Sequence, residues 1–233
     1  MSETTGEPPL TLACRRDSYR GEATEDRAEI IPAVRSQVLV VADGVGGRAG
    51  GAKAASLVLE LAGDVAPQVT RLDAPAWARF LMEADLIVHD DADGGETTAV
   101  IAQVSDDGRR IVGASVGDSE AWFVTPEGLF DLTEAQRKKP FLGSGNAQAV
   151  PFTLPVPVSG GTLIIATDGL FKYASQERII DAARLPDGEA AADALLNAAR
   201  LRSGSFSDDI TVLLCRIAQG SRKQSLWERI TAR

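Results

Sequence analysis

Acidic residues recur along this chain at points where a hydrophobic run gives way to a loop. They lie in five short segments, which are Thr24-Glu25-Asp26, Asp43-Gly44-Val45-Gly46-Gly47, Gly117-Asp118-Ser119, Asp168-Gly169 and Asp208-Asp209. Carboxylates are costly to place beside buried strands unless a cation neutralises them. Oxygen ligands with no His or Cys nearby are typical of Mg²⁺ and Mn²⁺ sites. The segments therefore predict a divalent-cation centre.

Three of these aspartates stand next to apolar runs that predict buried strands. Asp43 and Asp168 each directly follow such a run, and Asp208 lies just before the last one. If the three converge, they could hold two divalent ions about 3.5–4 Å apart, the spacing used for in-line displacement at phosphorus. A water between two such ions becomes the nucleophile, so no Ser, Cys or His nucleophile is needed.

Each segment alone is a weaker signal than the ordered set. A single Asp-Gly is usually a turn, which is our interpretation of Asp107-Gly108. The glycines after Asp43 could also form a phosphate-binding loop, but this stretch lacks the Lys-Ser/Thr of a P-loop. The metal centre is therefore the preferred interpretation.

The rest of the sequence predicts the elements that would position these residues. Apolar stripes at helical spacing predict helices near residues 54–61, 77–88, 175–185 and 187–201. Short β-prone segments at residues 97–104, 109–116, 120–124 and 129–132 predict a meander of hairpins, and residues 133–157 are expected to be irregular. No regular βαβ alternation is present. This order predicts an α+β fold, a four-layer α/β-sandwich in which two packed antiparallel sheets are flanked by pairs of helices.

Composition limits the class of protein. The 233 residues carry 24 basic and 33 acidic side chains, a net charge of −9, which disfavours nucleic-acid binding through a basic surface. No apolar run approaches the roughly 20 residues of a membrane span, and the polar N-terminus does not resemble a signal peptide. We therefore expect a cytoplasmic protein. Cys14 and Cys215 are expected to be buried, reduced thiols.

One domain is expected, with short tails. Residues 1–9 are interpreted as a disordered tail, residues 10–218 as the domain, and residues 219–233 as a C-terminal tail that could form a short helix. Leu226, Trp227 and Ile230 of this tail have helical spacing, and they could either pack on the domain or dock a partner.

Taken in order, the acidic motifs together with Gly95-Glu96-Thr97-Thr98-Ala99 resemble those of the metal-dependent protein phosphatases of type 2C, particularly the short bacterial branch. The resemblance runs over about residues 10–217. It implies a Mg²⁺- or Mn²⁺-dependent serine/threonine phosphoprotein phosphatase, in which a metal-bridging hydroxide attacks the phosphoryl group in line without a phosphoenzyme. The partners implied are phosphoserine and phosphothreonine proteins, with a cognate Ser/Thr kinase or its substrate among them. A monomer is expected.

The resemblance also implies a role for each site residue. Asp43 would bridge two ions, the carbonyl oxygen of Gly44 would bind one of them, and Asp168 and Asp208 would complete the other. Glu25 and Asp26 would order metal-bound waters. Further roles are implied for two other residues: Asp118 would hold a possible third ion together with Asp168, and Asp209 would form hydrogen bonds and not bind metal.

Some positions depart from the family pattern. Thr24 stands where the family usually has Asn, and the phosphate-binding Arg is displaced by one position to Arg20. An Asp-His pair common after the central Leu-Thr is absent here, after Leu132-Thr133. These departures leave an alternative function, a catalytically inactive regulatory pseudophosphatase that binds a phosphoprotein or kinase. His89, the one histidine, is not expected to be catalytic.

The irregular stretch could also contact the substrate. Lys138 and Lys139 lie within it and could attract acidic phosphopeptides, or they could be solvated loop charges.

Overall fold

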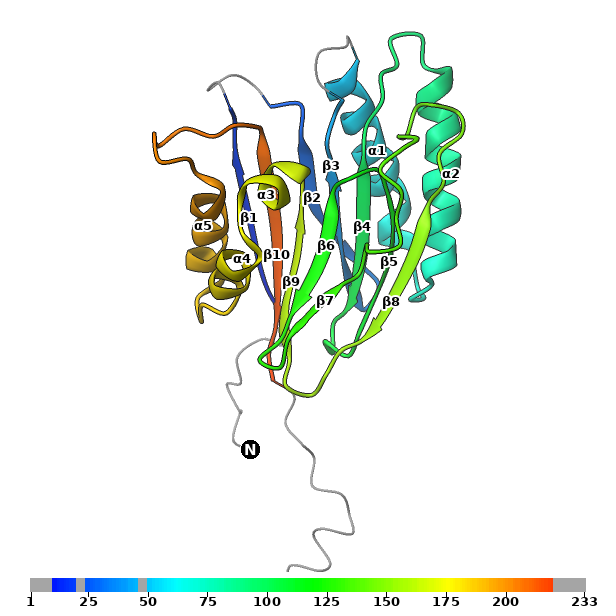
Figure 1. Cartoon of the computed structure of the whole chain (residues 1–233). Helices are drawn as coiled ribbons and strands as arrows, with labels where there is room; N and C mark the ends of the chain where they lie inside the picture. Colours follow the sequence, from blue (N-terminus) through cyan, green and yellow to red (C-terminus); the bar gives the residue numbers. More distant parts are fainter. Residues whose placement is uncertain (1–9, 20–23, 46–49, 220–233) are drawn as a thin grey trace, which may run out of the picture.

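The computed structural model describes residues 10–19, 24–45 and 50–219. Two antiparallel five-stranded sheets pack face to face, and helices cover both outer faces (Figure 1). One sheet has the strand order β1-β10-β9-β6-β7, and the other has the order β2-β3-β4-β5-β8. The predicted α+β sandwich is therefore confirmed. The tails expected at residues 1–9 and 219–233 lie outside the described residues, apart from Gln219.

The first sheet contains β1 (Leu10–Asp17), β10 (Ile210–Ile217), β9 (Gly161–Ala166), β6 (Glu120–Val124) and β7 (Leu129–Asp131). The second contains β2 (Arg27–Ala33), β3 (Ser36–Ala42), β4 (Ala99–Ser105), β5 (Arg110–Val116) and β8 (Val150–Pro155). The helices are α1 (Gly51–Val65), the 3₁₀ turn η1 (Ala66–Gln68), α2 (Ala74–Asp90), α3 (Asp168–Tyr173), α4 (Gln176–Ala183) and α5 (Gly188–Ala199). Within the described ranges, no helix is both long and apolar enough to cross a membrane.

The core has three layers, one between the sheets and one under each group of helices. In β3, Leu39 and Val41 face the other sheet, whereas Val38 and Val40 pack under α1 and α2. Because both faces of this strand are covered, its sequence is a continuous apolar run and not an alternating one. Because this buried strand ends at Ala42, Asp43 lies directly at the end of the core.

Three helix starts follow from capping residues. Asp73 accepts a hydrogen bond from the Ala76 amide at the start of α2, and Asp187 accepts one from the Ala190 amide at the start of α5. Ser175 plays the same role for α4. Capping side chains of these types satisfy amides that have no partner within the helix, so the starts could be predicted from sequence.

Two predictions about local structure are wrong. Residues 150–155 were expected to be irregular because of their prolines, but they form β8, which pairs only with β5. An edge strand tolerates proline because one of its two sides needs no amide donors. Cys14 is exposed and not buried, since β1 is also an edge strand, whereas Cys215 in the adjacent β10 is fully buried. Both thiols are free, as expected.

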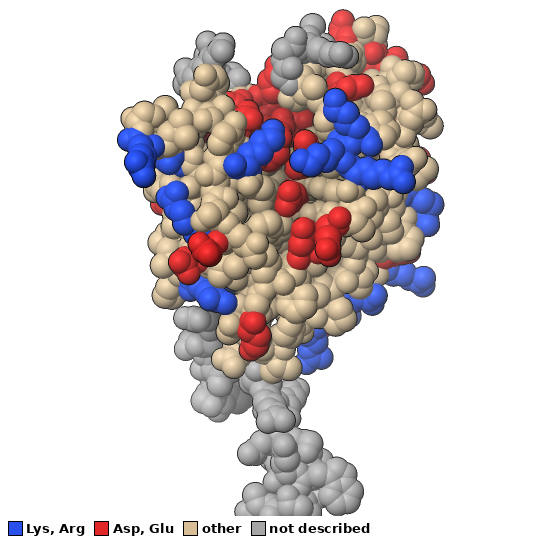
Figure 2. All heavy atoms as spheres, viewed as in Figure 1, with Lys and Arg blue, Asp and Glu red and all other residues tan. Residues whose placement is uncertain are grey.

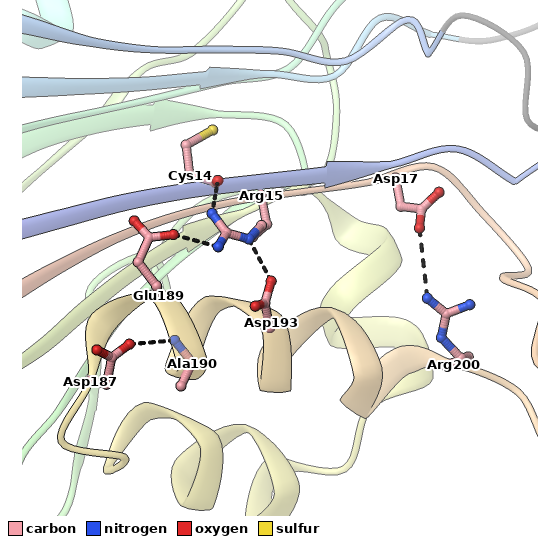
Figure 3. A network of polar contacts seen from close by, with 8 residues as sticks. All are labelled: Cys14, Arg15, Asp17, Asp187, Glu189, Ala190, Asp193 and Arg200. Atoms are coloured by element: carbon pink, nitrogen blue, oxygen red, sulfur yellow. Dashed lines mark hydrogen bonds and ion pairs between the residues drawn. The ribbon is translucent and has the colours of Figure 1, made fainter.

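Ion pairs fasten α5 to the edge strand β1. The Arg15 guanidinium contacts both Glu189 and Asp193 of α5, and Arg200 lies 3.7 Å from Asp17 at the end of the strand (Figure 3). Each exposed pair contributes little to stability. They join α5 and the residue that follows it to β1, which pairs with β10.

A buried carboxylate fastens the irregular loop to α2. Asp85 is 2% exposed and accepts hydrogen bonds from the amides of Gly143, Gly145 and Ala147, at 2.7, 3.1 and 2.9 Å. Next to these residues, Leu142 forms a two-way backbone bridge with Thr97, at 2.9 and 3.0 Å. The loop is therefore anchored on both sides.

We predict that Asp85→Ala lowers the free energy of unfolding by about 3 kcal/mol, because one buried amide and two partly buried amides lose a charged acceptor. Urea denaturation measures this change. Asp90→Ala, at an exposed aspartate of the same helix, is the matched control and should change stability by less than about 0.5 kcal/mol. Equal effects of the two substitutions would contradict the anchoring role.

Candidate metal centre

The acidic residues predicted from sequence meet at one end of the sandwich. Asp43 and Asp168 follow the ends of β3 and β9, while Asp26 and Asp208 precede the starts of β2 and β10. Because β2 is antiparallel to β3, the end of β3 and the start of β2 lie at the same end of their sheet. The same holds for the end of β9 and the start of β10. Figure 2 shows acidic side chains gathered at this end of the molecule, with Lys and Arg side chains beside them.

Asp43 lies at the electrostatic centre of this group. Burial, followed by the charges of Asp26, Asp168 and Asp208, raises the pKa of Asp43 to about 9. Burial also raises the pKa of Asp26 to about 6, although its carboxylate accepts a 3.0 Å hydrogen bond from the buried Thr167 hydroxyl. Without a cation, this part of the group therefore holds a proton at neutral pH.

Two further aspartates face the same group. Burial and then the charge of Asp168 raise the pKa values of both Asp118 and Asp208 above the ordinary value. The structure thus brings together Asp26, Asp43, Asp118, Asp168 and Asp208, which come from five separate segments of the chain.

A hydrogen-bonded motif holds the backbone of Asp43. The Asp43 amide donates to the Thr98 hydroxyl at 3.0 Å, and the Asp43 carbonyl accepts from the Thr98 amide and the Thr97 hydroxyl, both at 2.8 Å. The Thr98 hydroxyl in turn lies 2.6 Å from that of Ser119. The sequence pointed to the segments that contain these residues, but it did not predict this supporting role.

Gly44 lies against the start of α1, where no side chain fits. A Cβ atom at Gly44 would lie 2.4 Å from the carbonyl carbon of Gly51. Close to Gly51 and Gly44, the Glu25 Oε2 atom is buried and has no hydrogen-bond partner. An unpartnered, buried carboxylate oxygen beside closely packed glycine backbone suits an oxygen-liganded cation.

Lys172 is the residue of this site that the sequence did not reveal. It lies one helical turn after Asp168 in α3, forms an ion pair with the Asp168 carboxylate, and lies 3.9 Å from Asp208. Partial burial disfavours the ammonium group, but the hydrogen bond and charge of Asp168, with the charges of Asp208 and Asp118, raise the pKa of Lys172. Its i, i+4 spacing from Asp168 resembles an ordinary surface pair, so only the fold reveals its position.

The other candidates have different surroundings. Arg20, predicted to bind phosphate, and Gly46 and Gly47 lie outside the described residues. The His89 ring nitrogen Nδ1 is 3.0 Å from the Gly143 carbonyl oxygen, so this side chain contacts the irregular loop. Asp209 accepts a 2.8 Å hydrogen bond from the Tyr19 amide.

The two loop lysines also differ from each other. Burial and the charge of Asp168 raise the pKa of Asp118, and the charge of Lys138 partly offsets this rise, so Lys138 lies within electrostatic range of that carboxylate. Lys139 instead lies over the Phe141 ring, 5.5 Å from its centroid.

The donor set fits Mg²⁺ or Mn²⁺ in its chemistry. All its side-chain donors are carboxylate oxygens, and the pKa of Asp43 indicates charge that protein groups do not fully neutralise. As the side chains stand, no three His, Cys, Asp or Glu residues among those described already form a metal-binding group.

Comparisons with known proteins agree with this architecture. The family described as stage II sporulation protein E (SpoIIE) matches residues 34–218. No curated protein sequence matches the chain significantly.

Solved structures match over nearly the whole chain. The serine/threonine phosphatase Stp1 from Staphylococcus aureus has a TM-score of 0.76 at 20% identity, covering 89% of this chain and 95% of that one. The catalytic domain of the phosphatase PstP, solved with two manganese ions, has a TM-score of 0.74 at 20% identity, covering 90% and 98%. RsbX, solved with magnesium, has a TM-score of 0.71 at 17% identity, covering 90% and 96%.

The raised pKa values predict an unusual dependence of stability on pH. Asp43 in the folded protein keeps a proton up to about pH 9, whereas the unfolded chain releases it near pH 3.8. Because the folded state binds more protons, the free energy of unfolding of metal-free protein should fall as pH rises between these values. Asp43→Asn removes the titrating carboxyl and should stabilise the metal-free protein by about 1–2 kcal/mol at pH 8.

Urea denaturation in EDTA at pH 6, 7 and 8 tests this prediction. Asp64→Asn, at an exposed aspartate of α1, is the control and should follow the wild-type profile. If the free energy of unfolding of Asp43→Asn depends on pH as that of the wild type does, the carboxylates do not destabilise one another.

Proposed function

Since the chain belongs to the stage II sporulation protein E family and shares the fold of bacterial serine/threonine phosphatases, we propose that it is a Mg²⁺- or Mn²⁺-dependent phosphatase of phosphoserine and phosphothreonine proteins. The observation that carries this proposal is the convergence of the acidic residues around the buried Asp43. Burial, followed by the charges of these residues, raises the pKa of that carboxyl to about 9. A group of carboxylates in this condition favours divalent cations strongly, because a cation both removes the repulsion and replaces the proton.

Each residue has a distinct part in holding the ions. We call the side of the centre at Asp43 and Gly44 the inner side, and the side at Asp168 and Asp208 the outer side. Asp43 and the carbonyl oxygen of Gly44 would bind an ion at the inner side, and Asp168 and Asp208 would bind one at the outer side. Bound divalent ions would supply charge stabilisation for the phosphoryl oxygens and an activated water for in-line attack, so that no phosphoenzyme forms. Glu25 and Asp26 would accept hydrogen bonds from waters in the centre, and the Thr167 hydroxyl holds one oxygen of Asp26 in place.

The backbone of the centre is preorganised by the protein. Thr97 and Thr98 fix the Asp43 peptide through three hydrogen bonds, so its carboxylate emerges in one direction before any ligand binds. Preorganised charge at the reacting group is commonly the largest contribution to catalysis. Lys138, whose charge acts on Asp118, would contribute positive charge near the centre, and Arg20 is the proposed phosphate-binding residue.

The proposed substrates are phosphoproteins, with a cognate Ser/Thr kinase or its substrate as the physiological counterpart. Two of the structural relatives are named as serine/threonine phosphatases, which supports this class of substrate for the present chain.

Phosphate release from a phosphothreonine peptide tests the proposed activity. We predict that release by the full chain requires Mn²⁺ or Mg²⁺ and stops in EDTA. Asp43→Asn and Asp168→Asn should each lower kcat by at least about a hundredfold, because each removes a charged ligand. Asp90→Asn, at the exposed end of α2, is the matched control and should leave kcat unchanged.

One result would favour the other candidate function. If the wild-type protein binds Mn²⁺ and the phosphopeptide in calorimetry but releases no phosphate, the protein is a pseudophosphatase that recognises a phosphoprotein without turnover.

A further inference from the structure

One ammonium group contacts the carboxylates of the candidate centre. Lys172 forms an ion pair with Asp168, and its Nζ atom is 3.9 Å from the Asp208 carboxylate. Among the ion pairs of the described residues, these are the only ones that involve a carboxylate of the centre. The other pairs, such as those of Lys53 and Arg15, join acids elsewhere on the surface.

The fold holds this ammonium in place. Helix α3 begins at Asp168, one residue after the buried strand β9, and Lys172 follows four residues later in the same helix. Residues at i and i+4 lie on one face of a helix, so the lysine side chain extends back toward the first turn. The Asp168 side chain is only 14% exposed, whereas that of Lys172 is 47% exposed. The lysine therefore reaches the centre from the solvent side.

The positive charge is distributed unevenly across the centre. Asp118, Asp168 and Asp208 interact with Lys172, whereas the charges that act most strongly on Asp43 are those of other aspartates. Among the described residues, no ion pair supplies a counter-ion to Asp43 or Asp26 on the inner side. The outer side already has one.

We propose that Lys172 is a tethered counter-ion that occupies the outer side of the metal centre, between Asp168 and Asp208, and competes there with divalent cations. This inference rests on the proposed function, since it concerns the same centre. It specifies that the inner side binds its divalent ion more tightly than the outer side. Any ion held by Asp118, Asp168 or Asp208 must either displace the ammonium or bind against its repulsion.

A measurement of metal binding tests the inference without depending on turnover. Mn²⁺ binding to the full chain is measured by calorimetry, and bound Mn²⁺ is counted by electron paramagnetic resonance, for wild type and Lys172→Met. A like charge that contacts the same carboxylates weakens cation binding substantially even at a high effective dielectric constant. We therefore expect Lys172→Met to bind Mn²⁺ at least about tenfold more tightly at the outer side, or to bind one additional ion.

Two control variants separate this effect from a general change in charge. Lys172→Arg keeps the positive charge and should bind Mn²⁺ as the wild type does. Lys53→Met removes a lysine of similar exposure, 48%, which also contacts two aspartates, Asp91 and Asp93. Because those aspartates are not among the residues of the centre, Lys53→Met should leave Mn²⁺ affinity and stoichiometry unchanged.

Phosphate release measured on the same samples separates the two proposals. Equal Mn²⁺ binding by wild type and Lys172→Met would overturn the inference while leaving the proposed function intact. Tighter binding by Lys172→Met, with no phosphate release from any variant under saturating Mn²⁺, would support the inference and reject the proposed activity. If neither protein binds Mn²⁺ at millimolar concentration, both proposals are wrong.

Discussion

Repulsion between carboxylates at one end of the sandwich is the constraint on which the rest of the site depends. Strands from both sheets end or begin there, and each delivers an acidic residue at the margin of a hydrophobic core. Burial, followed by the charges of the neighbouring aspartates, raises the pKa of Asp43 to about 9. These crowded carboxylates destabilise the folded protein when no cation is bound, and bound divalent cations would remove that destabilisation.

The surrounding structure keeps these charges from moving apart. The backbone of Asp43 is hydrogen-bonded to Thr97 and Thr98, and Thr97 is bridged in turn to Leu142 of the irregular loop. Asp85 anchors the same loop from α2. The site is therefore supported from the core outward, through backbone contacts that do not depend on the metal.

Much of this arrangement could be predicted because it depends on local signals. The run before Asp43 is apolar throughout since both faces of β3 are covered, and capping residues such as Asp73 mark helix starts. The ordered acidic motifs also predicted the relationship with bacterial type 2C phosphatases, which the family match and the shared fold confirm. The metal-binding roles of individual residues stay predictions.

What could not be predicted depends on distant contacts. Pro151 was interpreted as evidence against a strand, but β8 lies at a sheet edge, where proline is tolerated. Cys14 is exposed because β1 is also an edge strand. Lys172 has the spacing of an ordinary helical ion pair with Asp168. Its location at the centre is recognised only through its distance to Asp208, which the pairing of β9 with β10 brings beside it.

The most direct test of the central claim is the number of protons released when Mn²⁺ binds. This number is obtained by calorimetry at pH 7.5 in buffers of different ionisation enthalpy. If crowded carboxylates hold a proton that the cation replaces, about one proton should be released per protein molecule, since the pKa of Asp43 is about 9. Mn²⁺ binding without proton release would contradict the account, because the carboxylates would then be ionised before the metal arrives.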